Sequence, residues 1–131
     1  MKINGVTIQM LPAASGDCIY LEFPDSDFRM LIDGGYAKTY QKYLKKFLLK
    51  LAAEGKRLNL IVVTHIDDDH ISGIRALLKE NGDSRNPKII EIDEIWFNSV
   101  NQCITSRNAE QGMSFAVKII LKSMCSTDID F

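Results

Sequence analysis

The run LNLIVVT, residues 58–64, constrains the fold more than any other stretch of the chain. Leucine and β-branched residues fill it almost without interruption, which is typical of a strand buried on both faces of a sheet. The run leads directly into HIDDDH, residues 65–70, where three adjacent aspartates lie between the two histidines of the sequence. We therefore expect a buried strand whose carboxyl end carries a dense group of ionisable side chains.

The segments before this strand predict three shorter strands and a helix. Apolar and polar residues alternate in VTIQML (6–11) and CIYLEF (18–23), and MLID (30–33) follows the turn-forming PDSD. The last two strands are predicted to pair as a hairpin. From residue 38 to 54 the pattern becomes helical, with one apolar face made by Leu44, Phe47, Leu48 and Leu51.

The segments after the strand alternate between helix and strand patterns. A helix is predicted to begin near His70 and to end at Gly82, and IIEIDEIWFNS (89–99) predicts one or two strands. A last amphipathic helix is predicted from Met113, Val117, Ile120, Leu121 and Met124. The order of strands, helix, strand, helix, strand and helix indicates an α/β (α+β) fold in which helices pack on a sheet.

Length and composition narrow the class of protein. The chain has 131 residues, of which 46% are hydrophobic, and this predicts one domain, 1–131. A net charge of −1 gives no sign of a bulk attraction to nucleic acid or to membranes. No apolar stretch approaches the roughly 20 residues that span a bilayer. Three widely spaced cysteines predict neither a disulfide framework nor a zinc knuckle, so a reducing cytoplasm is expected.

The cluster after the buried strand has the residue types of a metal site. In an extended segment His65 and Asp67 would face one way, and Asp69 and His70 would come beside them as the chain turns into the helix. Adjacent carboxylates repel one another, and a divalent cation would relieve that repulsion. A histidine at a helix N-terminus is favoured in its neutral form, which is the form that binds metal.

A simpler alternative is that Asp68 or Asp69 only caps the helix, with His70 a surface residue in its first turn. The convergence of four ligand-type residues after a buried strand favours the metal site over this alternative. An EF-hand does not fit, because the loop lacks the spaced Asp/Asn ladder, the mid-loop glycine and the terminal glutamate.

THIDDDH (64–70) resembles the H-x-H-x-D-H motif of the metallo-β-lactamase fold superfamily, with Asp67 where the second histidine commonly stands. The branch that it resembles most is the hydrolase domain of the bacterial competence DNA-uptake channel protein (ComEC-like). SGDCIYLEF (15–23) is similar to the first hairpin strand of that branch, and MLIDGG (30–35) to the strand that ends in an aspartate. RNAEQGMSFAVKIIL (107–121) is similar to a helix that follows the site in some relatives.

The resemblance implies a role for each residue of the motif. His65 and Asp67 would bind a first metal ion, and Asp69 and His70 a second. Asp69 would also be the catalytic residue that orients or deprotonates the attacking water. Zn²⁺ is the expected metal, with Mn²⁺ or Fe²⁺ as alternatives because a carboxylate in place of an imidazole hardens the first site.

The same resemblance gives Asp33 a supporting role, in which it holds the metal-binding loop by hydrogen bonds. Gly34 and Gly35 would let the backbone pass close to the site. The alternative for these three residues is a simple turn, since Asp and Gly are favoured turn residues.

The chemistry implied is hydrolysis of a phosphodiester or other phosphoryl ester by a metal-activated water. Nucleic acid is a candidate substrate on the analogy with the competence branch alone. The alternative is a non-catalytic metal-binding or assembly module that keeps the metal loop without turnover.

The superfamily fold is an αββα sandwich of two similar halves, and this chain is similar to the N-terminal half. The later ligands of the family include two further histidines, whereas His65 and His70 are the two histidines of this sequence. Half a sandwich would expose an apolar sheet face, so we expect a homodimer or a partner that supplies the C-terminal half. Light scattering tests this, and a monomeric mass would contradict it.

Three further features are expected to be structural. Lysines of the 38–54 helix lie mostly away from its apolar face and are expected to be solvated. Trp96 and Phe97 are expected in the core rather than on a base-stacking platform. Cys18 is expected to pack, although a catalytic cysteine would define another class of hydrolase.

Overall fold

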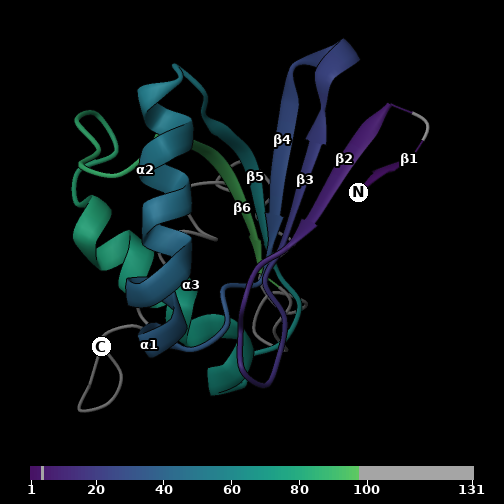
Figure 1. The fold of residues 1–131 in the computed structure, drawn as a ribbon. Helices are drawn as coiled ribbons and strands as arrows, with labels where there is room; N and C mark the ends of the chain where they lie inside the picture. The colour runs from purple at the N-terminus through teal and green to yellow at the C-terminus, as the bar shows by residue number, and fades with distance from the viewer. Residues whose placement is uncertain (4, 98–131) are drawn as a thin grey trace, which may run out of the picture.

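The computed structural model describes residues 1–3 and 5–97, which form one sheet with helices against it (Figure 1). Within these residues the sheet has six strands in sequence order: β1 Lys2–Ile3, β2 Val6–Met10, β3 Ile19–Phe23, β4 Phe28–Ile32, β5 Leu58–Val63 and β6 Ile92–Phe97. β1 to β4 pair antiparallel, and β4, β5 and β6 run parallel. The predicted α/β class is confirmed.

The hairpin and the buried strand predicted from the sequence are both present. β3 and β4 pair with Tyr20 opposite Leu31, and the short 3-10 turn η1, Pro24–Ser26, joins them. In β5 the side chains of Leu58, Leu60, Ile61 and Val63 are buried. Because β5 lies between β4 and β6, its backbone is paired on both sides as well.

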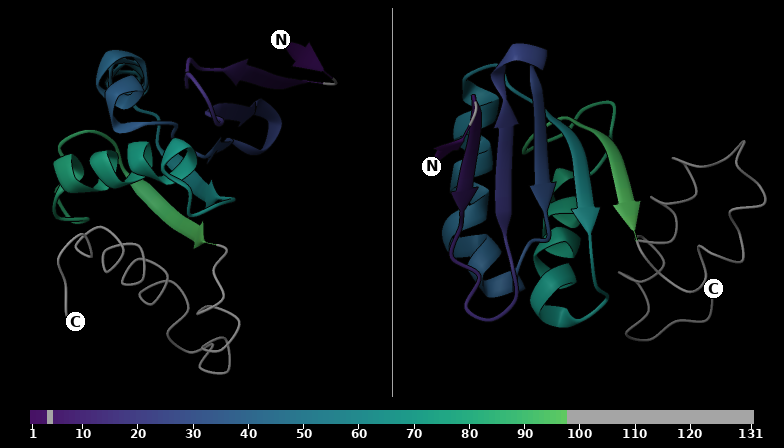
Figure 2. Two further views of the ribbon diagram at one scale, coloured as in Figure 1. Left: turned by 90° about the horizontal axis from the view of Figure 1, so that it is seen from below. Right: turned by 90° about the vertical axis from the view of Figure 1, so that its right-hand side faces the viewer.

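The helices lie together on one face of the sheet (Figures 1 and 2). They are α1 Ala37–Thr39, the π-helical segment η2 Tyr40–Leu44, α2 Lys45–Ala53 and α3 Asp68–Asn81. The helix expected over 38–54 is therefore interrupted by a π turn, which changes the phase of the following residues. The turn begins at Tyr40, whose buried ring reaches α3 and whose hydroxyl donates to Glu80 at 2.9 Å.

The core lies between these helices and the sheet. Leu31, Ile61 and Ile95 are neighbours in register across β4, β5 and β6, and each is at most 4% exposed. The ring of Phe47 in α2 meets the ring of Tyr20 in β3 edge to face, with the centroids 4.8 Å apart. Burying an apolar side chain of this size contributes about 1.5–3 kcal/mol, so these contacts hold the helices to the sheet.

The face of the sheet away from the helices also carries apolar side chains, and Trp96 differs there from its prediction. Val62 pairs with Ile32 on one side and Trp96 on the other. Trp96 is 59% exposed, so its expected place in the core is wrong, whereas Phe97 is 4% exposed as expected. The reason is the alternation of side chains along a strand, which sends two consecutive residues of β6 to opposite faces.

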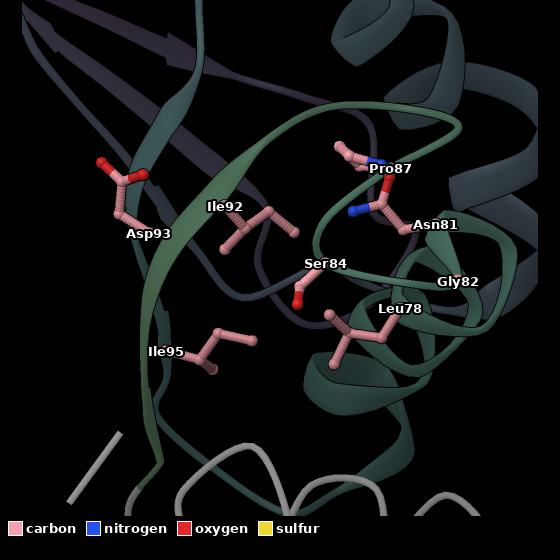
Figure 3. A pocket seen from close by; sticks show the side chains of 8 residues that line it. All are labelled: Leu78, Asn81, Gly82, Ser84, Pro87, Ile92, Asp93 and Ile95. Carbon is pink, nitrogen blue, oxygen red and sulfur yellow. The ribbon is translucent and has the colours of Figure 1, made fainter. Parts of the chain in front are cut away.

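The C-terminal end of α3 is tied to the segment that leads into β6 by the buried side chain of Asn81. Its amide donates to the Ile90 carbonyl at 2.8 Å and accepts from the Ile89 and Ile90 N–H groups at 2.9 and 3.0 Å. A cavity of about 200 Å³ lies beside it, between α3 and β6 (Figure 3). The carboxylate of Asp93, on the rim, is already bound by Arg57 and Asn59.

The last predicted helix and the segment 107–121 lie outside the described residues. Among the helices of the described part, no helix has the length and apolar character that a membrane span requires.

Candidate metal centre

Two adjacent strand ends supply the foundation of the site. Asp33 follows β4, and Thr64 and His65 follow β5. Because β4 and β5 are parallel neighbours, their carboxyl ends meet at the same edge of the sheet. The Asp33 N–H donates to the Val62 carbonyl at 2.8 Å, which extends the pairing to the site.

The side chain of Asp33 is the centre of a hydrogen-bond network. It is fully buried, and its backbone is in the left-handed region with φ of 58°. One carboxylate oxygen, Oδ1, accepts from the Thr64 N–H at 2.7 Å. The other, Oδ2, accepts from the Thr64 hydroxyl and lies 2.9 Å from Nδ1 of His70. Burial removes water from this carboxylate. The hydrogen bonds from its three partners replace that water and stabilise the charge.

The helix that carries His70 starts earlier than expected. α3 begins at Asp68, because Asp67 is extended and its carbonyl accepts from the His70 and Ile71 N–H groups at 2.9 and 3.0 Å. Asp67 occupies the N-cap position without a side-chain cap hydrogen bond. Capping by Asp68 or Asp69 is therefore the wrong explanation for the cluster. Asp68 points along the helix, where it accepts from the Ser72 hydroxyl at 3.4 Å.

Glycines bring α3 against the loop that follows β4. The Gly34 N–H donates to the His70 carbonyl at 2.9 Å, and the Gly73 N–H donates to the Gly35 carbonyl at 2.8 Å. A Cβ atom on Gly73 would lie 1.8 Å from the Gly34 oxygen, and one on Gly34 would lie 2.6 Å from the Ile74 nitrogen. The close approach of these two backbones fixes the position of His70 relative to Asp33.

The two imidazoles lie side by side. The ring centroids of His65 and His70 are 4.8 Å apart, and Oδ1 of Asp69 is 3.6 Å from Nε2 of His70. An ionised carboxylate can only accept, so Nδ1 of His70 carries the proton that faces Asp33. The lone pair of neutral His70 is then on Nε2, on the side of Asp69.

The hydrogen bond to Asp33 raises the pKa of His70 above its ordinary value, although burial of the ring lowers it. The charges of Asp33, Asp69 and Asp17 add to the increase. Metal binding needs the neutral ring, whereas these carboxylates stabilise the protonated ring. A cation at Nε2 would therefore compete with a proton for that nitrogen.

The donor set fits a divalent cation. One ligand atom each from Asp33, His65 and His70 lie within 4.8 Å of one another. Since both oxygens of Asp33 are already held by Thr64 and His70, we assign Asp33 to supporting the ligands rather than binding. Asp69 borders His70, with its Oδ1 3.6 Å from Nε2 of the ring.

Of the four ligands predicted from the sequence, all described, the structure places the rings of His65 and His70 side by side and Asp69 beside the ring of His70. The side chain of Asp67 is exposed, and both Asp67 and Asp69 lie outside the group formed by Asp33 and the two histidines. The part of these two aspartates in binding stays a prediction.

Two residues of the site were not singled out from the sequence. The Ser15 hydroxyl, in the loop between β2 and β3, donates to Oδ2 of Asp69 at 3.3 Å and lies 3.4 Å from the Tyr36 hydroxyl. Thr64 joins Asp33 to the loop. Thr64 could have been identified from its position at the end of the predicted buried strand. The sequence around Ser15 gives no sign that its loop contacts Asp69, 54 positions along the chain.

Cys18 is not suited to nucleophilic catalysis. Its side chain is 3% exposed, and burial, with a smaller contribution from the charge of Asp33, raises the pKa of its thiol to about 12. The thiolate is the reactive form, so this cysteine is inert at neutral pH. The expectation that Cys18 packs is confirmed.

The comparison with known families agrees with this geometry. The sequence model described as the metallo-beta-lactamase superfamily matches residues 11–107, which is well over half of the chain and includes every site residue described above. Comparison with curated proteins gives no significant match. The chain therefore belongs to the metallo-beta-lactamase superfamily.

Proposed function

We propose that the chain is a metal-dependent hydrolase of phosphoryl esters. The superfamily consists mostly of metal-dependent hydrolases, which supports the general class of reaction. The observation that supports the proposal is the pair of imidazoles, His65 after β5 and His70 in the first turn of α3, with buried Asp33 bonded to His70. Such a set of imidazole and carboxylate donors on a rigid edge suits a hydrolytic cation.

The residues that would hold the cation are His65, Asp67, Asp69 and His70, with Zn²⁺ the first choice and Mn²⁺ or Fe²⁺ the alternatives. A bound divalent cation would lower the pKa of water and stabilise charge on a phosphoryl oxygen. The protein supplies orientation, since Asp33 fixes the ring of His70 and Ser15 fixes one oxygen of Asp69. The other oxygen of Asp69, Oδ1, would accept a proton from an attacking water.

A phosphodiester substrate, including nucleic acid, is supported by the similarity of THIDDDH and LIDGG to the competence branch. The carboxylate of Asp67 is a harder ligand than the usual imidazole. A metal ion that prefers such a ligand also prefers the hard oxygens of a phosphoryl group. This narrower assignment rests on that resemblance and on donor chemistry.

The test is hydrolysis of bis(p-nitrophenyl) phosphate by the chain loaded with Zn²⁺ or Mn²⁺. Replacing Asp69 with alanine is expected to lower kcat about 10²–10⁴-fold, the usual contribution of a general base. Asp68→Ala is the matched control, because the neighbouring carboxylate is exposed and turned to Ser72. Equal rates for the native chain and Asp69→Ala, or no turnover by the native chain, would contradict the proposal.

The second candidate is a metal-binding or assembly module without turnover. What favours it is that hydrogen bonds already hold both oxygens of Asp33, the carboxylate grouped with His65 and His70. Metal binding by a chain that hydrolyses no phosphodiester would identify this case.

The apolar sheet face with Ile32, Val62 and exposed Trp96 supports our proposal that a second copy or a partner chain packs there.

A further inference from the structure

The hydroxyl of Thr64 lies between a carboxylate and an imidazole. Its Oγ1 donates to Oδ2 of Asp33 and is 2.8 Å from Nδ1 of His65. The backbone N–H of Thr64 is held separately by Oδ1 of Asp33. The hydroxyl therefore has two polar neighbours at hydrogen-bond distance.

Counting protons assigns the direction of both bonds. A threonine hydroxyl has one proton and two lone pairs, and an ionised carboxylate has no proton to give. The hydroxyl proton must then point to Asp33, which leaves a lone pair of Oγ1 facing His65. A stable contact at 2.8 Å requires a donor on the other side, so Nδ1 of His65 carries a proton.

We propose that Thr64 is a positioning residue that holds neutral His65 in the Nδ1–H tautomer and leaves its Nε2 as the donor. Asp33 then sets both rings, His70 by a direct hydrogen bond and His65 through the hydroxyl of Thr64. Both rings then keep a lone pair on Nε2, and one buried carboxylate determines both tautomers. The assignment of Nε2 as a metal donor rests on the proposed function, whereas the tautomer does not.

The consequence is large for His65 because its side chain is exposed. A neutral imidazole in water favours the Nε2–H form, which has no lone pair at Nε2. Without Thr64 the ring would return to that form and would also gain rotational freedom. Outer contacts of this kind typically change metal affinity about 10–100-fold.

The experiment compares the full native chain with Thr64→Val and Thr64→Ser. Valine keeps the β-branched shape and the backbone N–H bond to Asp33 but removes the hydroxyl, and serine keeps the hydroxyl. The tautomers are read from imidazole ¹⁵N chemical shifts of metal-free protein, at a pH high enough to leave both rings neutral. Zn²⁺ affinity is measured by competition with a chromophoric chelator.

We expect His65 to be in the Nδ1–H form in the native chain and in Thr64→Ser, and to shift to the Nε2–H form in Thr64→Val. His70 should keep the Nδ1–H form in all three, since its partner is Asp33 itself. Thr64→Val should bind Zn²⁺ about 10–100-fold more weakly than the native chain, and Thr64→Ser should bind nearly as well.

Native His65 in the Nε2–H form, or a tautomer that is unchanged in Thr64→Val, would overturn the inference. The native measurement decides it even if the valine variant does not fold. A native chain that binds no Zn²⁺ would contradict the proposed function, while the tautomer would still test the role of Thr64.

Discussion

Substituting alanine for Gly73 is expected to lower the free energy of unfolding by about 3 kcal/mol or more, the upper range for overpacking at a tight contact. The new Cβ would lie 1.8 Å from the Gly34 oxygen and 2.5 Å from the Gly34 carbonyl carbon, both backbone atoms that cannot move away alone. Relief requires α3 to move from the loop after β4. The intrinsic gain in helix propensity from Gly to Ala, about 1 kcal/mol, is smaller than this cost.

The measurement is urea unfolding, with Gly55→Ala as the control. Gly55 has φ of 76° and open space around its Cβ position, so alanine there is subject to backbone strain without a collision. A left-handed conformation costs alanine about 1–2 kcal/mol. If Gly73→Ala is no less stable than Gly55→Ala, the close approach of α3 to Gly34 is not a fixed feature of the fold.

The same substitution should weaken metal binding in any molecules that remain folded. The hydrogen bonds from Gly34 to the His70 carbonyl and from Gly73 to the Gly35 carbonyl both cross the interface that would open. The ring of His70 would then lose its alignment with Asp33, which lies on the other side of that interface.

The strands and the main helices could be predicted because their patterns depend on local periodicity. The apolar run of β5 and the alternation in β3 each point to one structure, and the structure has strands at both places. The position of the ionisable cluster at the carboxyl end of β5 was also predicted, because the apolar run leads directly into it.

What could not be predicted depends on contacts between distant segments. The phase of α3 is set by the extended backbone of Asp67, which moved the start of the helix to Asp68. The contact between Ser15 and Asp69 joins a loop to a helix 54 positions further along the chain. The exposure of Trp96 depends on which face of β6 the helices cover, and an apolar strand does not encode that choice.

Replacing Asp33 with alanine is expected to cost about 3–5 kcal/mol of stability, the range for breaking a buried charged network by removing one partner. The Thr64 N–H, the Thr64 hydroxyl and Nδ1 of His70 would all lose their acceptor. The pKa of His70 should also fall, because the hydrogen bond to Asp33 is the largest cause of its increase. Urea unfolding and an NMR titration of His70 measure the two effects. Asp83→Ala, at an exposed ion pair with Arg85, is the control and should change stability by less than about 1 kcal/mol.

Asparagine at position 33 separates the charge of this residue from its shape. The amide oxygen can still accept from the Thr64 N–H, but the amide nitrogen would present protons to the Thr64 hydroxyl and to Nδ1 of His70. Nδ1 of His70 must then become an acceptor, which moves its proton to Nε2 and removes the lone pair offered to a cation. We expect Asp33→Asn to be more stable than Asp33→Ala and yet to bind Zn²⁺ at least about 10-fold more weakly than the native chain. Native affinity in Asp33→Asn would mean that Asp33 acts on the fold alone and that another group orients the imidazoles.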